Sequence, residues 1–307
     1  MLYLKKINYE KSNDSYCRHA KHDGHAAKSR CAISESYTRS YESIGTEAQE
    51  QTISSFDKTI FSYKYAGNPF DFVINSSTAM TVTKVVGIGP NVFGGRVTGI
   101  DFSNTIKRIG YQAFNGSIMP STMNIPESIT TIDAHAFYEC RKLKSVYIPA
   151  IVTSIGYAPF YNCYDLEEIV VASDNPNYKS VDGVLYNKDM TEVIQYPGGK
   201  TKRTYVAPSS VVSINREAFA CNRNVYSVVL PYGVRYLSVA AFNNATLHDI
   251  FLPASMVDIG DAAFTPFRTG FTNQPKIYVM SGTRRQYLSA VPWSGEENII
   301  EAEFVQK

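Results

Sequence analysis

The chain has 307 residues, of which 44% are hydrophobic, and its 30 Lys and Arg nearly balance its 28 Asp and Glu. A chain of this length can bury enough apolar surface to fold without disulfides or metals. The composition excludes wholesale disorder, and the formal net charge of +2 excludes the strong basic excess of a dedicated nucleic-acid-binding protein. We therefore expect a folded protein with no nucleic-acid partner.

Residues 1–55 mix Ser, Lys, Glu and Tyr without a sustained hydrophobic period, so we predict that they are a mobile or mis-annotated leader. The first residues lack the apolar stretch of a signal peptide, and no apolar run in the chain approaches about 18 residues. We therefore expect no membrane span, and no signal peptide is visible.

A cluster of possible metal ligands lies inside this leader: Cys17, His19, His22 and His25, followed by Cys31. Its spacing matches no recognised zinc motif, and the surrounding segment offers no core that would preorganise a site. We therefore predict no metal site and no cofactor, while metal binding by this cluster stays open as the alternative.

Residues 56–81 precede the regular part of the chain. The stretches Phe61–Tyr65 and Phe70–Ile74 are typical of two short strands, and residues 67–69 are typical of a turn. A repeat array needs atypical units to cover the apolar faces at its ends. We therefore predict an N-terminal β cap here.

An internal repeat of about 23 residues runs through residues 82–280. In five segments a Phe follows a Pro by eleven positions, with aliphatic residues or Met at the third and sixth positions after the Pro. Two earlier units, around Phe93 and Phe114, keep this frame without the Pro. The five pairs are Pro126 and Phe137, Pro149 and Phe160, Pro208 and Phe219, Pro231 and Phe242, and Pro253 and Phe264.

Each unit ends in a short alternating stretch that predicts a strand. Before Pro149, for example, Val146 and Ile148 take inward positions and Tyr147 points outward. A unit this short cannot bury its apolar face alone, so neighbouring coils must stack and share one continuous core. The fold class that follows is a β-rich α/β solenoid of seven to eight coils with a parallel strand ladder.

The run from Ile125 to Leu143, IPESITTIDAHAFYECRKL, resembles the repeat of the BspA-like leucine-rich repeat proteins, whose consensus is roughly IPxSVTSIGxxAFxxCxxL. The match recurs from about residue 82 to 280. The resemblance implies a leucine-rich repeat solenoid like those of bacterial or protozoan surface and secreted proteins used in adhesion and protein binding. The chain departs from the consensus at Pro159, which replaces Ala before Phe160.

One interval breaks the regular spacing, because Phe160 and Phe219 are 59 residues apart. Residues 173–208 fill this interval and resemble the hairpin-bearing long repeat of the same family. At the other end of the array, residues 281–307 predict a C-terminal cap. Thr283–Gln286 fits a capping box for a short helix over residues 283–291, and a final strand follows Trp293, which we expect to cover the last coil.

Motifs that could carry chemistry are explained better by structure. Gly198–Thr201 mimics the end of a phosphate-binding loop, but the first Gly of that motif would fall at Ile194, so we predict a tight hairpin turn. His135 and His248 have no nucleophile that the repeat would place beside them. Cys140, Cys163 and Cys221 occupy tight turn positions, where we expect buried free thiols. We predict no enzyme and no catalytic residue.

The outward strand position two residues before each repeat Pro, or its equivalent, supplies the candidate binding surface. Because strands stack in register, we expect these side chains to form one ladder that is apolar and aromatic over its C-terminal two-thirds. Apolar stripes that face water mark interaction sites, although strands also favour Val, Phe and Tyr for packing alone. The predicted binding residues are Tyr147, Val170, Val206, Val229, Phe251 and Tyr278.

These observations predict a non-catalytic, monomeric binding or adhesion module. Its ligand would be a protein or a glycan, of a host surface or matrix for example. The charged fraction of only 19%, with 22 Tyr, and the resemblance favour an extracellular or cell-surface location. The alternative is a structural spacer in a larger surface assembly with no ligand of its own.

Overall fold

The computed structural model describes residues 106–264, 275–290 and 298–303, together with five strand segments between residues 49 and 101. All of them lie in one compact unit, residues 46–307. The predicted ligand cluster around Cys17 and the predicted position of Trp293 fall outside the described residues. Most of the predicted leader does so as well, but Gln49–Ile53 form strand β1 and pair with β4, so these five residues belong to the fold.

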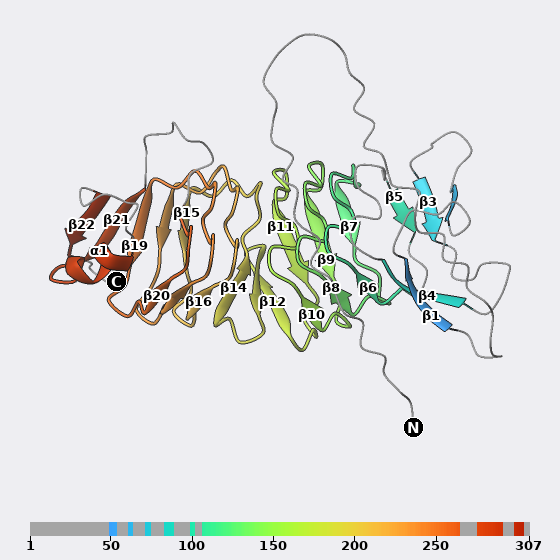
Figure 1. The fold of residues 1–307 in the computed structure, drawn as a ribbon, viewed down its shortest axis with the longest axis horizontal. Coiled ribbons are helices and arrows are strands. Elements are labelled where there is room, and N and C mark those ends of the chain that lie inside the picture. Colours follow the sequence, from blue (N-terminus) through green and yellow to red (C-terminus); the bar gives the residue numbers. More distant parts are fainter. Residues whose placement is uncertain are drawn as a thin grey trace, which may run out of the picture. The chain divides into compact units, whose positions relative to one another are not determined.

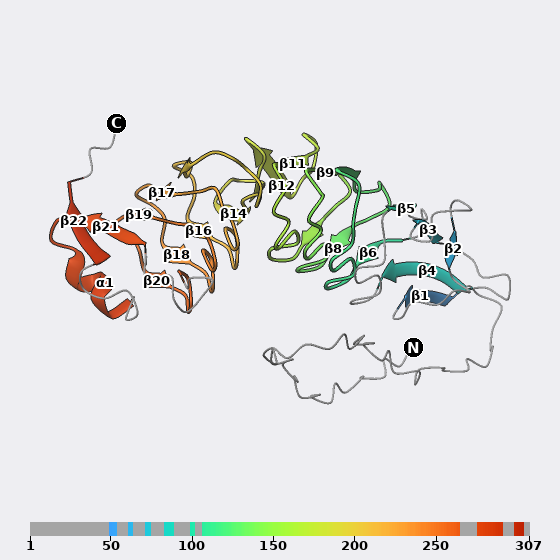
Figure 2. The same cartoon turned by 90° about the horizontal axis from the view of Figure 1, so that it is seen from above.

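The described residues form a β solenoid in which each regular coil contributes one strand to each of two series of parallel strands (Figures 1 and 2). The predicted β-rich solenoid is thereby confirmed. The first series comprises β7 (Thr122–Asn124), β9 (Ser145–Ile148), β11 (Glu168–Val171), β15 (Thr204–Val206), β17 (Ser227–Val229), β19 (Asp249–Leu252), β21 (Lys276–Met280) and β22 (Ile299–Ala302). The second comprises β1, β4 (Thr83–Ile88), β6 (Arg108–Ile109), β8 (Thr131–Ile132), β10 (Ser154–Ile155), β14 (Glu192–Gln195), β16 (Ser213–Ile214), β18 (Tyr236–Leu237) and β20 (Asp258–Ile259).

Inward side chains come from the positions that the repeat reserves for aliphatic residues. In β9, Val146 and Ile148 are fully buried, whereas Tyr147 between them is exposed. β9 pairs in parallel with β11, so that Tyr147 lies beside Val170. The period of two in the sequence thus separates the core from the outer surface at each strand.

A tight corner holds the Phe of each coil. The corner lets the Phe137 N–H donate to the carbonyl of Pro159 in the next coil, at 2.9 Å. The contact needs only a carbonyl from the residue before Phe160, which explains why Pro can replace Ala there and why the Phe160 ring is still buried. The residue two positions before the Phe has a left-handed φ between 41° and 57° in six coils, at Gln112, His135, Ala158, Glu217, Ala240 and Ala262.

The core is divided into two clusters at the long repeat, so the expectation of one continuous core is wrong. The rings of Phe137 and Phe160 stack at 5.3 Å, but Phe219 stacks on Tyr196, at 4.9 Å, on the other side of the division. Instead of a coil carbonyl, the side-chain Oε1 of Gln195 accepts the hydrogen bond from the Phe160 N–H, at 3.1 Å. Tyr196 therefore begins a second column of stacked rings.

The long repeat contains the hairpin that the resemblance implies. β12 (Tyr178–Val181) and β13 (Val184–Asn187) pair antiparallel, and β13 continues antiparallel to β14, which rejoins the second series beside β16. Leu185 packs in the first cluster, whereas its neighbours Val184 and Tyr186 pack in the second. Because successive side chains of a strand point to opposite faces, β13 forms a wall between the two cores.

Both predicted end units contain the expected elements, and their role as caps stays a prediction. β2 (Phe61–Tyr63) pairs antiparallel with β3 (Asp71–Ile74), which pairs in parallel with β5 (Gly99–Asp101). Helix α1 (Arg284–Ala290) agrees with the predicted helix to within one residue at each end.

The first turn of α1 is capped differently from the prediction. The Thr283 hydroxyl donates backwards to the Met280 carbonyl, at 2.7 Å, and does not bond to the helix. The carboxylate of Glu301 in β22 instead accepts from the Arg284 N–H, at 3.1 Å. A carboxylate at the N-terminus of a helix also interacts favourably with the positive end of the helix dipole. The helix is therefore held by the last strand of the sheet.

Candidate functional site

The six predicted binding residues all lie at outward positions of the first strand series. Tyr147, Val170 and Val206 have exposed fractions of 37%, 36% and 62%. Val229, Phe251 and Tyr278 are half-buried. Within each sheet the register is the predicted one: Tyr147 pairs with Val170, Val206 with Val229, Val229 with Phe251, and Phe251 with Tyr278.

These residues do not form the single ladder that the sequence predicts. Tyr147 and Val170 belong to the sheet β7-β9-β11, and the other four belong to the sheet β15-β17-β19-β21-β22. Strands β11 and β15 do not pair. The surface is therefore divided into two parts at the long repeat, as the core is.

The tip of the β12–β13 hairpin explains the interruption. The Ile169 N–H in β11 donates to the carbonyl of Gly183, at 2.9 Å, where a neighbouring strand would otherwise accept. Gly183 has a φ of +70°, and a Cβ there would lie 2.9 Å from the Cβ of Glu168, so a larger residue would not fit. Asp182 forms ion pairs with Lys200 and Lys202, at 3.3 and 3.4 Å, just before β15. The tip thus fills the place between β11 and β15.

We call the outward apolar row of the larger sheet the C-terminal ladder; its members are Val206, Val229, Phe251, Tyr278 and Ile300. Ile300, the partner of Tyr278 in β22, is missing from the sequence prediction because β22 was assigned to the cap. The rings of Phe251 and Tyr278 stack at 4.7 Å with an interplanar angle of 13°. Burial and the adjacent charge of Asp249 raise the pKa of Tyr278, so its hydroxyl stays protonated at neutral pH.

A second row borders the same sheet, directly before its strands. The Arg203 guanidinium lies 4.9 Å from the ring centroid of Tyr226, whose ring lies 5.0 Å from that of His248. We call these three residues the cationic row. Arg203 and His248 are exposed and Tyr226 is half-buried. The sequence prediction overlooked this row because it considered only positions inside the strands, although all three residues share one repeat position.

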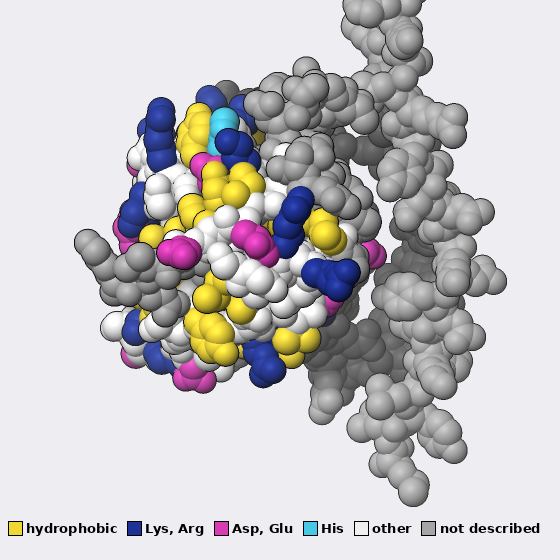
Figure 3. Space-filling model, turned by 90° about the vertical axis from the view of Figure 1, so that its left-hand side faces the viewer, with side chains coloured by type: hydrophobic (Ala, Val, Ile, Leu, Met, Phe, Trp, Pro, Cys, Tyr) yellow, Lys and Arg dark blue, Asp and Glu magenta, His cyan; other side chains and the backbone are white. Residues whose placement is uncertain are grey.

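Figure 3 shows the end of the array that carries β22 and α1. Hydrophobic side chains reach the surface there between cationic and anionic ones. Met280, at the end of β21, is one exposed hydrophobic residue of this region, with an exposed fraction of 39%.

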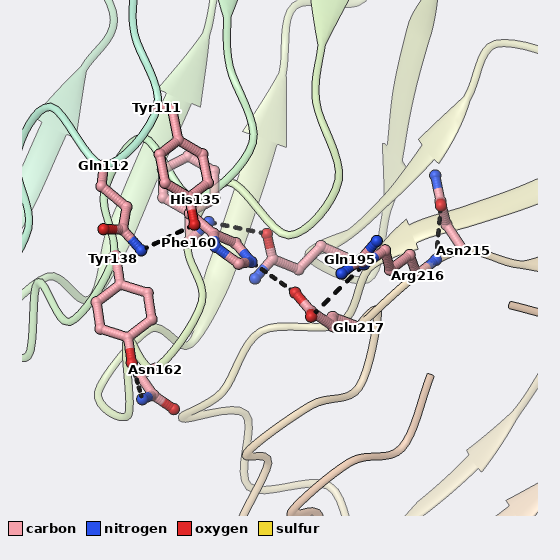
Figure 4. Close-up of polar contacts among 10 residues, drawn as sticks. All are labelled: Tyr111, Gln112, His135, Tyr138, Phe160, Asn162, Gln195, Asn215, Arg216 and Glu217. Atoms are coloured by element: carbon pink, nitrogen blue, oxygen red, sulfur yellow. Dashed lines mark hydrogen bonds and ion pairs between the residues drawn. The ribbon is translucent and has the colours of Figure 1, made fainter. Parts of the chain in front are cut away.

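His135 lies in a second polar cluster, at the Phe corner of its coil. Its Nε2 is 2.5 Å from Oε2 of Glu217, 82 residues away, and Figure 4 shows its ring pointing from the corner toward that carboxylate. The Arg216 guanidinium lies over the ring of Tyr157, at 4.6 Å from the centroid. Both contacts join the first core cluster's coils to the coil after the long repeat. His135 and Glu217 each lie two positions before the Phe of their own coil. This shared repeat position is the sequence signal that could have predicted their contact.

The cluster around His135 has no catalytic constellation. Tyr111, Tyr138, Tyr157 and Tyr161 surround the imidazole with ring centroids 5.0 to 5.8 Å away. Nδ1 of His135 is buried and has no hydrogen-bond partner. The Glu217 carboxylate orients the imidazole, but general base catalysis also requires a nucleophile that hydrogen bonds to the base, and among the described residues no Ser, Thr or Cys hydrogen bonds to His135. We assign His135 a role in joining the two parts of the array.

The remaining sequence candidates have structural roles. Cys140, Cys163 and Cys221 are buried free thiols, as predicted. The Cys163 thiol donates to the Phe137 carbonyl of the preceding coil, at 3.1 Å, and burial raises its pKa. A tight turn is present at Gly198–Thr201, where the Lys200 N–H donates to the Pro197 carbonyl, at 3.3 Å, but the predicted hairpin is wrong, because the flanking strands β14 and β15 belong to different sheets.

The described residues contain no group of three or more His, Cys, Asp or Glu side chains that could hold a metal ion. Within the same residues, no helix is long and apolar enough to cross a membrane.

Comparisons with known proteins agree with the repeat architecture. The protein is similar in structure to a leucine-rich repeat protein from Eubacterium ventriosum, with 24% identity and a TM-score of 0.52, over 63% of this chain and 64% of that one. This chain therefore spans somewhat less than two thirds of that protein's length. It is less similar to the pneumococcal vaccine antigen PcpA, with 16% identity and a TM-score of 0.44, over 85% of this chain and 90% of that one. Among curated proteins, no match is found.

The family model described as the BspA type leucine-rich repeat region matches six copies, over residues 68–192 and 200–269. These ranges contain the regular coils from β4 to β20 and the β12–β13 hairpin of the long repeat, whereas β21 and β22 lie beyond them. The match covers more than half of the sequence, and the repeat pattern, the parallel strand series and the hairpin agree with it. The chain belongs to the BspA-type leucine-rich repeat family.

Proposed function

We propose that this protein is a non-catalytic binding or adhesion module that holds a protein or glycan ligand on the outward face of the β15–β22 sheet. The observation that carries the proposal is the C-terminal ladder, five apolar side chains in register on adjacent strands. Tyr147 and Val170 form a smaller second contact area on the other side of the hairpin. The family favours a position at the cell surface.

Rigidity supports this role. Each ladder side chain stands on a hydrogen-bonded strand whose inward residues are buried, as Val228 and Ile250 are. Little conformational entropy is then lost when a ligand is bound, and stacked aromatic residues such as Phe251 and Tyr278 are frequent anchors of binding energy. A structural spacer, the alternative function, would not need this apolar row.

Binding of immobilised matrix proteins and glycans to the full chain tests the proposal. Phe251→Ser and Tyr278→Ser should each weaken binding of any ligand by about 1–2 kcal/mol, or roughly 5- to 30-fold. Tyr232→Ser is the matched control, because Tyr232 is a large, exposed side chain outside both strand series, with an exposed fraction of 67%. Equal binding by all three variants would favour the spacer.

A further inference from the structure

We infer that the ligand of the C-terminal ladder is an amphipathic α-helix with an acidic flank, which lies across strands β15 to β21. This inference rests on the proposed function and names the partner of the same face. It is carried by three rows of side chains that run parallel across the sheet, namely the cationic row, a polar row and the C-terminal ladder.

The polar row lies between the other two, and its side chains on β15 and β17 are short. Its members are outward residues of the four strands: Thr204, Ser227, Asp249 and Lys276. Arg203 and Val206 are three positions apart, so along the strand the cationic row and the ladder are separated by about 10 Å at roughly 3.3 Å per residue. This is close to the diameter of an α-helix with its side chains, about 10–12 Å. A helix can therefore contact both rows while it passes over the short side chains of Thr204 and Ser227.

The spacing along the rows favours a helix over an extended peptide. Neighbouring strands are about 4.8 Å apart, one helical turn rises about 5.4 Å, and same-face side chains of an extended chain are about 6.7 Å apart. Over the three steps from β15 to β21, the mismatch is about 2 Å for a helix and about 6 Å for an extended chain. A helix can thus place one side chain against each strand, in the helix-in-groove mode of recognition.

The charge of the face selects an acidic flank. Arg203 and Lys276 are exposed, and within the described part of the chain neither has a carboxylate partner. His248 adds a third potential cation between them. The only carboxylate in the polar row is Asp249, whose charge contributes to the raised pKa of Tyr278. Carboxylates of a ligand would therefore find their partners at Arg203 and Lys276, and its apolar stripe would contact the ladder.

The test uses synthetic peptides of about 18 residues and the full-length chain. The first peptide carries Leu at helical spacing on one stripe and Glu along one flank. The second has Lys in place of every Glu, and the third keeps the composition of the first but contains a central Pro-Gly that breaks the helix. Fluorescence anisotropy measures affinity, and circular dichroism measures the helix formed on binding.

We expect the Glu-flanked peptide to bind at least 10-fold more tightly than the other two and to gain helicity when bound. Arg203→Glu and Lys276→Glu should each reduce its affinity at least 5-fold and should improve binding of the Lys-flanked peptide. Phe251→Ser should weaken both helical peptides, whereas Tyr232→Ser should weaken neither. Thermal melts of each variant verify that it remains folded.

Equal affinity for the Glu- and Lys-flanked peptides would overturn the acidic flank, and equal affinity for the helix-broken peptide would overturn the helix. If all three peptides bind with a Kd above about 1 mM, both the acidic flank and the helix are overturned. In any of these cases the proposed function would still stand if Phe251→Ser weakened capture of a matrix protein. An acidic oligosaccharide that binds wild type and Phe251→Ser alike, through Arg203 alone, would show a glycan site in place of a helix site.

Discussion

Replacing the buried Asn222 by Ala should destabilise the protein strongly. Asn222 is fully buried three positions after Phe219, where the repeat consensus has Cys. Its Nδ2 donates to the Pro197 carbonyl, at 2.8 Å, and its Oδ1 accepts from the N–H groups of Asn224 and Val225, at 2.9 and 2.7 Å. Ala would leave the N–H groups of Asn224 and Val225 without a partner, whereas the Pro197 carbonyl would still accept from the Lys200 N–H, at 3.3 Å.

A buried polar group left unpaired costs about 1–3 kcal/mol, so the lower limit for two such groups is about 2 kcal/mol. Asn222→Cys is the informative comparison, because Cys140 and Cys163 at the same position donate to the preceding coil, at 3.3 and 3.1 Å. A Cys at position 222 would fill more of the volume than Ala and could donate one hydrogen bond of its own to the preceding coil, so this variant should lose about 1 kcal/mol less than the Ala variant. Urea unfolding followed by circular dichroism measures both. A loss below about 0.5 kcal/mol for Asn222→Ala would refute the reasoning.

Three further predictions test the core, the junction and the thiols. Phe160→Ala should lower the free energy of unfolding by about 3–5 kcal/mol in the same urea titration, because it removes a buried, stacked ring. Glu217→Gln should cost about 1–3 kcal/mol by weakening the buried contact with His135, whereas Glu167→Gln, at an exposed 3.9 Å ion pair, should change stability by less than about 0.5 kcal/mol. Since burial raises the pKa of Cys163 and so reduces its thiolate fraction, iodoacetamide at pH 8 should alkylate it far more slowly in the native than in the urea-unfolded chain; mass spectrometry of the Cys163 peptide measures this, and equal rates would contradict the burial.

The regular coils could be predicted from the sequence because every contact in them repeats at one spacing. Pro149 and Phe160, eleven positions apart, mark where a strand ends and where a ring enters the core. Local alternation then decides which side of each strand is buried, as at Val146 and Tyr147. Such features depend on residues within one coil and its neighbour, and a single repeat unit contains the necessary information.

The division of the core and of the ladder depends on contacts that no repeat unit contains. The spacing of 59 positions from Phe160 to Phe219 indicates an insertion. This spacing does not show that Gly183 takes a strand position beside β11. Nor does it show that His135 meets Glu217 across the insertion. Both contacts are set by the way the hairpin displaces one stack of coils from the next, which is a property of the folded chain.

The fold places different demands on the inward and the outward strand positions. Inward residues are fixed by packing, but the fold tolerates a polar residue at the outward position, since Asn124 occupies it in β7 next to Tyr147 in β9. Strand formation therefore does not require an apolar side chain there. Five consecutive strands nevertheless carry Val, Val, Phe, Tyr and Ile at this position, beside a row that begins with an exposed Arg203. Strand packing accounts for part of this run, and we propose that a partner which covers it accounts for the rest.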